Sequence, residues 1–259
     1  MNKIEKPIVI LDMGINSLML VNIFRENYPN DDIVYINDLK TYEYEGLEVD
    51  EIKNKILELL VRVKKYDPKL VVLSNDTIIE YGKELIQQEL EGIPFVNIVD
   101  EIIRIVNLKY EFKNIAFFAP IGIIESNMYQ HNFNYTRLYN LDASILLDDI
   151  RMAKMKTANS FEKMRLALLP VFKKEIDVIV PTIPNLLLFK TEIYEYVKSN
   201  SDLLNIDEVI LEKAKELLKP SIGKNKKYVY LDIMMMDDIN RVLNKILSVK
   251  YKLMNKGRK

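Results

Sequence analysis

Short apolar runs alternate with longer amphipathic segments along the whole 259-residue chain. The short runs are rich in β-branched residues and lack the polar alternation of a strand that faces water on one side. Strands of this kind are covered on both faces, and their alternation with helical segments is typical of βαβ units on a parallel sheet. We therefore predict an α/β fold whose clearest strands are residues 8–11, 33–36, 70–73, 95–98, 115–118, 178–180 and 228–231.

The segments between these runs predict helices. In the segment 49–65, for example, Ile52, Ile56 and Val63 recur at the spacing of one helix face. The predicted helices span residues 16–27, 49–65, 78–90, 100–108, 126–133, 161–174, 191–200, 206–218 and 237–251.

The strand ends repeat at a fixed distance along the chain. The strand before Asp12 is matched by the strand before Ala119, and the strand before Ser74 by the strand before Pro181, both at an offset of 107 residues. This repeat predicts two similar α/β halves. Ligands of open α/β sheets bind at the carboxyl ends of the strands, so four loops are expected to line a cleft between the halves: 12–14, 74–77, 120–122 and 181–184.

The composition excludes several classes of function. The chain has no cysteine and one histidine, which excludes disulfides, thiolate metal sites and thiol nucleophiles and leaves few ways to build a zinc site. A net charge of −1 argues against nucleic-acid binding by the whole surface. No apolar run reaches the roughly 18 residues of a membrane span, and no segment has the pattern of a secretory signal. We expect no membrane association and a cytoplasmic protein.

Several segments, in order, resemble the glutamate racemase family of the Asp/Glu racemase superfamily. Residues 7–14 resemble the opening strand and Asp-Ser-Gly turn of that family, and residues 28–35 its Leu-Pro-Asn-Glu-Asp-Ile-Ile-Tyr stretch. Residues 73–76 stand where the family has Ala-Cys-Asn-Thr, and residues 181–184 stand where it has Cys-Thr-His-Tyr. Residues 126–129 match its Ser-x-x-Tyr segment. The resemblance covers nearly the whole chain.

This resemblance implies two flavodoxin-like parallel-sheet domains with an interdomain cleft. It places residues 1–97 and 208–259 in the first domain and residues 98–207 in the second. The family works without a cofactor or a metal, and two cysteines on opposite faces of the substrate act as base and acid. Ser74 and Pro181 stand at these cysteine positions here, and Ile183 stands at the position of the family histidine. We therefore expect two-base racemisation of glutamate to be absent.

The ligand-binding residues implied by the resemblance are only partly kept. Asp12, Tyr44, Asn75 and Thr182 match ligand contacts of the family, whereas Met13 replaces a serine. Acidic side chains also stand where a glutamate carboxylate would lie, and their repulsion disfavours that ligand; they are Glu43, Glu45 and Asp76.

Two functions follow from this pattern. The first is a racemase-like protein that acts by binding a small amino or dicarboxylic acid or a protein partner. Some glutamate racemases bind DNA gyrase, so the resemblance extends to a protein partner, and a homodimer also fits. The alternative is an active enzyme of the racemase and isomerase family with a changed mechanism or substrate, in which Asp76 or Asp12 is a single base.

Each candidate residue also has a purely structural interpretation. Asp12 and Asn75 can cap the helices that follow them, and Thr182 can belong to a turn. His131 lies in a polar stretch and fits a solvated surface. The acidic pairs at 148–149 and 237–238 fit helix starts, and the methionines at 234–236 fit a core. The segment 219–259 carries eleven basic and three acidic residues, which fits either a solvated helix face or an acidic or nucleic-acid partner.

Overall fold

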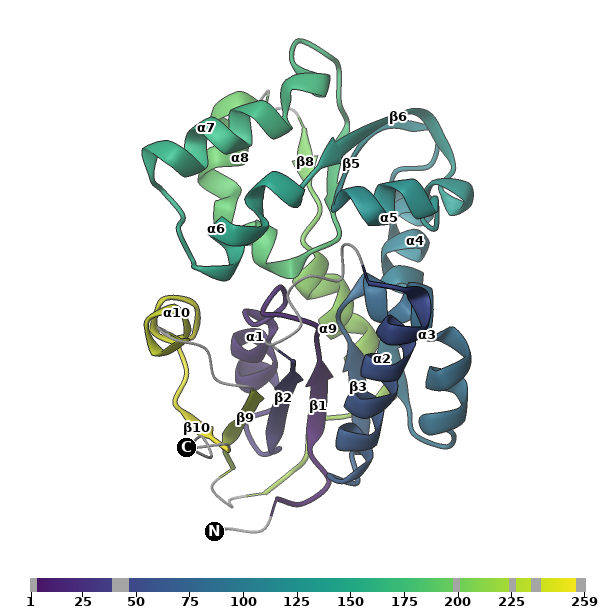
Figure 1. The fold of residues 1–259 in the computed structure, drawn as a ribbon, viewed down its shortest axis with the longest axis vertical. Coiled ribbons are helices and arrows are strands. Elements are labelled where there is room, and N and C mark those ends of the chain that lie inside the picture. The colour runs from purple at the N-terminus through teal and green to yellow at the C-terminus, as the bar shows by residue number, and fades with distance from the viewer. Residues whose placement is uncertain (1–3, 39–46, 198–200, 224–226, 234–238, 255–259) are drawn as a thin grey trace. The chain divides into compact units, whose positions relative to one another are not determined.

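The computed structural model describes residues 4–38, 47–197, 201–223, 227–233 and 239–254, and it divides the chain into two compact units. One unit combines Met1–Ile98 with Ile210–Lys259, and the other comprises Val99–Val209. Each unit contains one sheet, and all strand pairs described in both sheets are parallel (Figure 1). The predicted α/β fold class is confirmed.

The first unit is built on a six-stranded sheet in the order β10-β9-β2-β1-β3-β4. The strand β1 is flanked by β2 and β3, and all residues of these three strands are buried, which explains their continuous apolar sequence. The strands are β1 Ile8–Leu11, β2 Ile33–Asn37, β3 Leu70–Leu73, β4 Phe95–Asn97, β9 Val229–Ile233 and β10 Tyr251–Leu253.

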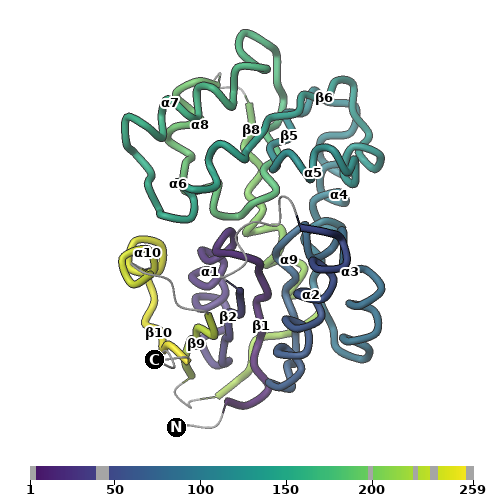
Figure 2. The backbone as a smooth tube through the Cα atoms, in the orientation of Figure 1, coloured from purple at the N-terminus to yellow at the C-terminus, as the bar shows by residue number. Residues whose placement is uncertain are grey.

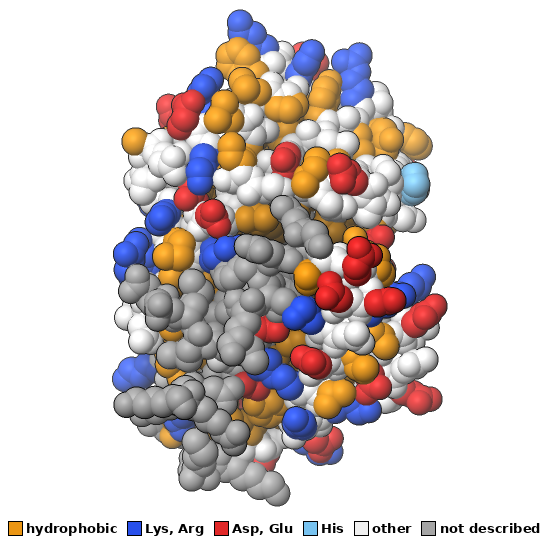
Figure 3. All heavy atoms as spheres, viewed as in Figure 1, with side chains coloured by type: hydrophobic (Ala, Val, Ile, Leu, Met, Phe, Trp, Pro, Cys, Tyr) orange, Lys and Arg blue, Asp and Glu red, His pale blue; other side chains and the backbone are white. Residues whose placement is uncertain are grey.

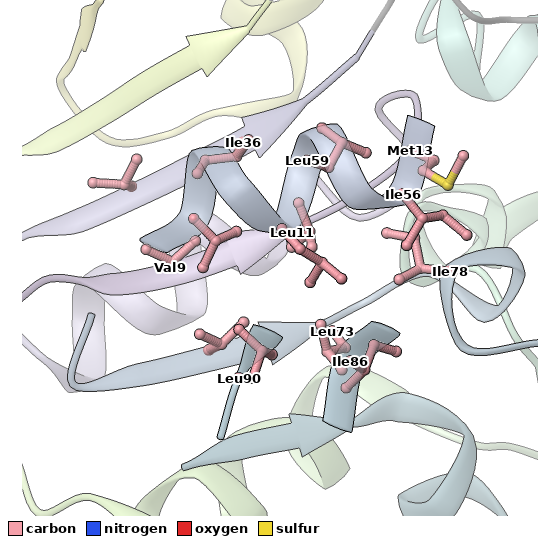
Figure 4. Close-up of a cluster of buried hydrophobic side chains, with 14 of the residues drawn as sticks. Val9, Leu11, Met13, Ile36, Ile56, Leu59, Leu73, Ile78, Ile86 and Leu90 are labelled. Carbon is pink, nitrogen blue, oxygen red and sulfur yellow. The ribbon is translucent and has the colours of Figure 1, made fainter. Parts of the chain in front are cut away.

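Helices with one apolar face cover this sheet. The helix α2 (Val49–Lys64) has the five buried positions expected from its spacing, and Ile56 and Leu59 belong to the same apolar cluster as Val9 and Leu11 of β1 (Figure 4). A capping box at Glu48 and Glu51 starts this helix. The other helices are α1 (Leu20–Asn27), α3 (Asp76–Glu89) and α10 (Ile239–Ile246).

The second unit contains a four-stranded sheet in the order β6-β5-β7-β8. The central strands are β5 (Lys113–Ala119) and β7 (Val178–Pro181), and the edge strands are β6 (Tyr135–Asp142) and β8 (Asp202–Leu203). Its core is apolar and includes Phe118, Met164 and Phe189. The helices are α4 (Ile98–Lys109), α5 (Ile121–Ser126), α6 (Leu147–Arg151), α7 (Ala158–Ala167), α8 (Lys190–Tyr196) and α9 (Ile206–Leu217), of which α9 continues into the first unit.

Several predicted helices are shorter in the structure or are absent. The helix predicted at 126–133 is wrong, because α5 ends at Ser126, Asn127 has a left-handed backbone conformation, and only a 3₁₀ turn follows at Gln130–Asn132. The helix predicted at 161–174 ends early, and a 3₁₀ turn that contains Pro170 follows at Leu169–Val171.

Three strands were not predicted. The edge strand β6 is largely exposed and polar, so it lacks the apolar pattern of the central strands. The strand β8 has two residues. The strand β10 lies where the sequence predicts the end of a helix, and it joins the C-terminal part of the chain to β9 of the first sheet (Figure 2).

The residues 28–35 that resemble the racemase family stabilise the amino-terminal edge of the first sheet. The buried carboxylate of Asp31 binds Lys69 Nζ and accepts a hydrogen bond from Ser221 N at 3.1 Å. The Tyr28 hydroxyl donates to Leu218 O at 3.0 Å, and Asp32 accepts from Tyr228 N at 3.0 Å. These contacts hold Leu218, Ser221 and Tyr228 against this edge of the sheet. A hollow at this edge is lined by the same groups, whose charges are already paired.

Candidate functional site

The carboxylate of Asp12 follows β1 and is completely buried. Its Oδ2 accepts hydrogen bonds from the Tyr35 hydroxyl at 2.6 Å and from Ser17 N at 2.8 Å. Its Oδ1 accepts one from Asn75 Nδ2 at 3.2 Å. Asp12 therefore joins the loops that follow β1 and β3 to the end of β2.

Burial raises the pKa values of both Asp12 and Tyr35. It raises the pKa of Asp12, and the hydrogen bonds from Tyr35, Ser17 and Asn75 counteract only part of that effect. Burial, followed by the nearby Asp12 charge, also raises the pKa of Tyr35 well above its ordinary value. Tyr35 therefore remains a neutral donor to Asp12 at physiological pH.

The hydroxyl of Ser74 is engaged within the protein. Ser74 is 1% exposed, and its Oγ donates to Leu11 O at 2.9 Å. Ser17 Oγ lies 2.6 Å from Ser74 Oγ, and either hydroxyl can be the donor in that contact. No His, Lys, Asp or Glu is among these partners, so nothing in this set of contacts activates Ser74 as a base.

Asn75 and its neighbours combine capping with loop contacts. The Asn75 side chain accepts a hydrogen bond from Ile78 N at 3.3 Å and caps α3, as the structural interpretation predicts. Its amide nitrogen also reaches Asp12 and Met13 O. Asp76 is buried in the first turn of α3 and accepts from Thr77 N at 3.0 Å.

The last residue of β2, Asn37, completes this edge of the first sheet. Its side-chain nitrogen donates to Gly14 O, and Gly14 has a φ of 88°, a conformation that favours glycine. Among the described residues Asn37 Oδ1 has no hydrogen-bond partner. The loop that follows lies outside the described residues, and it contains Tyr44, Glu43 and Glu45.

The second sheet has a corresponding edge, but its register differs from the predicted one. Ser74 N donates to Leu11 O at 3.1 Å in the first sheet, and Thr182 N donates to Phe118 O at 3.0 Å in the second. Leu11 and Phe118 are 107 residues apart, whereas Ser74 and Thr182 are 108 apart. The strand predicted to end at residue 180 includes Pro181. By backbone register, therefore, Thr182 rather than Pro181 corresponds to Ser74.

Buried polar atoms without partners occur at this second edge. Thr182 is 1% exposed, and its Oγ1 has no hydrogen-bond partner in the described part of the chain. Asp207, in the first turn of α9, is 6% exposed and its Oδ1 also lacks such a partner there. Burial, with a smaller contribution from the Glu208 charge, raises the pKa of Asp207 to about 7. Ile183 is buried, and Pro184 begins a 3₁₀ turn.

The sequence did not identify Ser17, Tyr35 or Asp207 as site residues. Tyr35 is read as a strand residue because it lies inside an apolar run, and its contact with Asp12 depends on the pairing of β1 with β2. Asp207 is read as one of two acidic residues at a helix start, and its burial is not visible in the sequence.

The remaining candidates lie elsewhere. His131 is exposed, as expected, and is the pale blue side chain of Figure 3. Asp149 is buried and pairs with Lys163 at 3.1 Å, whereas the side chain of Asp148 is exposed and pairs with Arg151. The acidic pair at 237–238 and the methionines at 234–236 fall outside the described residues.

The described residues contain neither a metal-binding cluster nor a membrane-spanning helix. No group of three or more His, Cys, Asp or Glu side chains in that part of the chain is placed to hold a metal ion. No helix in the described ranges is long and apolar enough to cross a membrane.

Comparison with known proteins finds glutamate racemases at low identity. No family model matches the chain. A glutamate racemase of Shewanella frigidimarina is 25% identical over 228 residues, which cover 85% of this chain and 86% of the relative. This chain is similar to glutamate racemases.

Solved glutamate racemases share the fold. The isoform RacE1 of Bacillus anthracis superposes with a TM-score of 0.83 at 18% identity, covering 96% of this chain and 97% of that one. A glutamate racemase of Francisella tularensis, solved in complex with D-glutamate, gives a TM-score of 0.80 at 16% identity and covers 96% of both chains. The racemase-like fold expected from the resemblance is confirmed.

Proposed function

We propose that this chain is a glutamate racemase-like protein that has lost two-cysteine racemisation and acts by binding a small ligand or a protein partner. The observation that carries the proposal is the absence of any cysteine, together with the state of Ser74. Removing the Cα proton of an amino acid requires an activated base close to the substrate. Ser74 donates its proton to a backbone carbonyl and has no titratable partner among its hydrogen bonds.

The second cysteine position supports the same proposal. Pro181 has no titratable group, and Thr182, which corresponds to Ser74 in backbone register, has a hydroxyl with no base hydrogen-bonded to it in the described part of the chain. Since each general acid or base contributes roughly 10²–10⁴-fold to a rate, loss of both would leave very little racemase activity. Ile183 at the histidine position removes a further proton-transfer group.

The proposed ligand is a small amino or dicarboxylic acid, with no cofactor, and Asp12, Tyr44, Asn75 and Thr182 are its proposed contacts. The D-glutamate complex of the Francisella tularensis racemase supports this class. We also propose that the protein binds a protein partner or forms a homodimer, and that it is cytoplasmic. The proposed domains are residues 1–97 with 208–259 and residues 98–207.

The alternative is an enzyme that uses Asp12 or Asp76 as its base. Asp12 is completely buried and accepts three hydrogen bonds, which leaves it poorly placed to receive a substrate proton. Asp76 is also buried, and it accepts a bond from the backbone of its own helix. We therefore favour the binding protein.

Incubation of the purified protein with L-glutamate in D₂O tests the proposal. We expect no Cα deuteration and no D-glutamate above a protein-free control. Deuteration that scales with protein concentration would refute the loss of activity. Two double variants then test whether residue 181 or residue 182 occupies the position of the second cysteine. They are Ser74→Cys with Pro181→Cys, and Ser74→Cys with Thr182→Cys. Activity gained by only one of them identifies the position that corresponds to the second cysteine.

A further inference from the structure

Two neighbouring strands of the second sheet end beside buried polar residues. The strands β7 and β8 pair in parallel with Val178 opposite Asp202 and Ile179 opposite Leu203, and Leu204 N continues the ladder to Ile179 O at 3.0 Å. Thr182 comes directly after β7, and Asp207 comes four residues after the end of β8, in the first turn of α9. Both residues therefore lie at the carboxyl edge of one sheet, inside one unit.

Both residues carry a buried oxygen that no described residue satisfies. Neither Thr182 Oγ1 nor Asp207 Oδ1 has a hydrogen-bond partner in the described part of the chain, although both residues are more than nine-tenths buried. A buried polar atom without a partner is unfavourable, and most buried polar atoms in folded proteins are paired. Thr182 Oγ1 and Asp207 Oδ1 follow adjacent strands, at the edge where α/β sheets bind ligands. Their position indicates a site that is completed by a bound molecule.

The charges at this edge indicate which chemical group fits. Both oxygens can accept a hydrogen bond, and one belongs to a carboxyl group. A ligand carboxylate here would be repelled, whereas an ammonium group has three donors and a positive charge.

We propose that Thr182 and Asp207 bind the amino group of a small molecule at the carboxyl edge of the second sheet. Asp207 accepts a charge-assisted hydrogen bond from the ligand nitrogen, and Thr182 Oγ1 accepts a second one. This inference rests on the proposed binding function and names the chemical group that the site recognises. It also assigns Asp207 to the site, a residue that no sequence motif identified.

Pairs of compounds that differ only in the amino group provide the test. The panel contains D- and L-glutamate with glutarate, D- and L-aspartate with succinate, and L-alanine with propionate. We expect at least one amino acid to raise the melting temperature of the wild-type protein in a saturable way, while its partner without the amino group does not. Isothermal titration then measures the affinity for that amino acid.

Three variants locate the contact. Asp207→Asn removes the negative charge and should weaken binding about 10- to 100-fold, the range for one hydrogen bond to a charged group. Thr182→Val removes one acceptor at nearly constant volume and should weaken binding less, by about 2- to 10-fold. The matched control is Glu208→Gln, which removes an exposed carboxylate from the same helical turn and should keep the affinity within about twofold.

Proton release gives a measurement that does not depend on any variant. Near pH 6.5 part of Asp207 is protonated, so an ammonium that binds its carboxylate must displace a proton. Titrations of the wild-type protein in phosphate and in Tris should therefore differ in heat by the difference in buffer protonation enthalpy times the fraction of protons released. Equal heats in the two buffers would contradict the proposal, even if Asp207→Asn fails to fold.

The remaining outcomes are also decisive. The inference is overturned if no amino acid of the panel shifts the wild-type melting temperature, if glutarate, succinate or propionate binds as well as its amino acid, or if Asp207→Asn binds like the wild type. Cα deuteration in D₂O is scored separately. Binding through Asp207 together with deuteration would refute the proposed loss of activity and leave this site in place. Absence of both would refute this site and leave a protein partner as the function.

Discussion

Replacement of Asp207 by asparagine should stabilise the protein more as the pH rises. The carboxyl of Asp207 has an ordinary pKa of 3.8 when the chain is unfolded and a pKa of about 7 in the folded protein, because burial disfavours its charged form. The folded state therefore binds more protons between these two values, and the wild type loses stability as the pH rises from 3.8 to 7. Below pH 3.8 the group carries no penalty, and above pH 7 the penalty is complete.

The size of the effect follows from the two pKa values. The rise of the Asp207 pKa from 3.8 to about 7 lowers the free energy of unfolding of the wild type by about 4 kcal/mol above pH 7. At pH 5 only about 1.5 kcal/mol of the penalty is present, so the advantage of Asp207→Asn should grow by about 2.5 kcal/mol between pH 5 and pH 8. Asparagine has nearly the same shape and no charge, so the packing of the first turn of α9 is kept.

Urea unfolding followed by circular dichroism at pH 5, 6, 7 and 8 measures this difference, and the absence of tryptophan makes circular dichroism preferable to fluorescence. The control is Glu208→Gln, whose exposed carboxylate should change stability by less than about 1 kcal/mol at every pH. An offset between Asp207→Asn and the wild type that stays constant from pH 5 to pH 8 would refute the reasoning, because a constant offset cannot come from a titrating group.

Two further substitutions test the contacts of the first unit. Tyr35→Phe removes the 2.6 Å hydrogen bond to the buried carboxylate of Asp12 and should lower the free energy of unfolding by about 1.5–3 kcal/mol; a loss below about 0.5 kcal/mol in urea unfolding would contradict the network. Hydrogen bonds from Lys69 and Ser221 hold the pKa of Asp31 below its ordinary value, although burial acts to raise it. Lys69→Met removes the cation that pairs with this buried carboxylate. We expect a loss of about 3 kcal/mol at pH 7 that shrinks as the pH falls below 4 and Asp31 is protonated; a pH-independent loss would refute the ion pair as its cause.

The central strands could be predicted from the sequence because burial on both faces requires a continuous apolar run. The strands β1, β2, β3 and β7 all have this pattern. The edge strand β6 could not be predicted, because exposure allows polar residues and removes the pattern. The helix expected at 126–133 shows the opposite failure: residues that tolerate a helix are held in a left-handed turn at Asn127 by their surroundings.

The strand β7 extends one residue beyond the predicted strand end at residue 180, and this difference has a local cause. Proline donates no backbone hydrogen bond, so the sequence suggests that the strand ends before it. In the structure β7 includes Pro181, and its neighbour β8 has only two residues and ends at Leu203, so a proline is tolerated at the end of β7. Sequence spacing thus placed the second loop correctly, but only the backbone register shows that Thr182 corresponds to Ser74.

The two halves use the same edge of a parallel sheet in different ways. In the first half, Asp12 and Ser74 direct their hydrogen bonds to Tyr35, to Ser17 and to the backbone, which stabilises the loops and leaves little capacity for chemistry. Asn37 Oδ1 is the exception at that edge, and in the second half Thr182 and Asp207 both retain buried oxygens that are not satisfied within the described chain. A chain that lost catalysis and all function would be under no pressure to keep such costly groups, since a valine or an asparagine would be more stable there. Their presence therefore favours a protein that still binds a ligand over an inactive remnant.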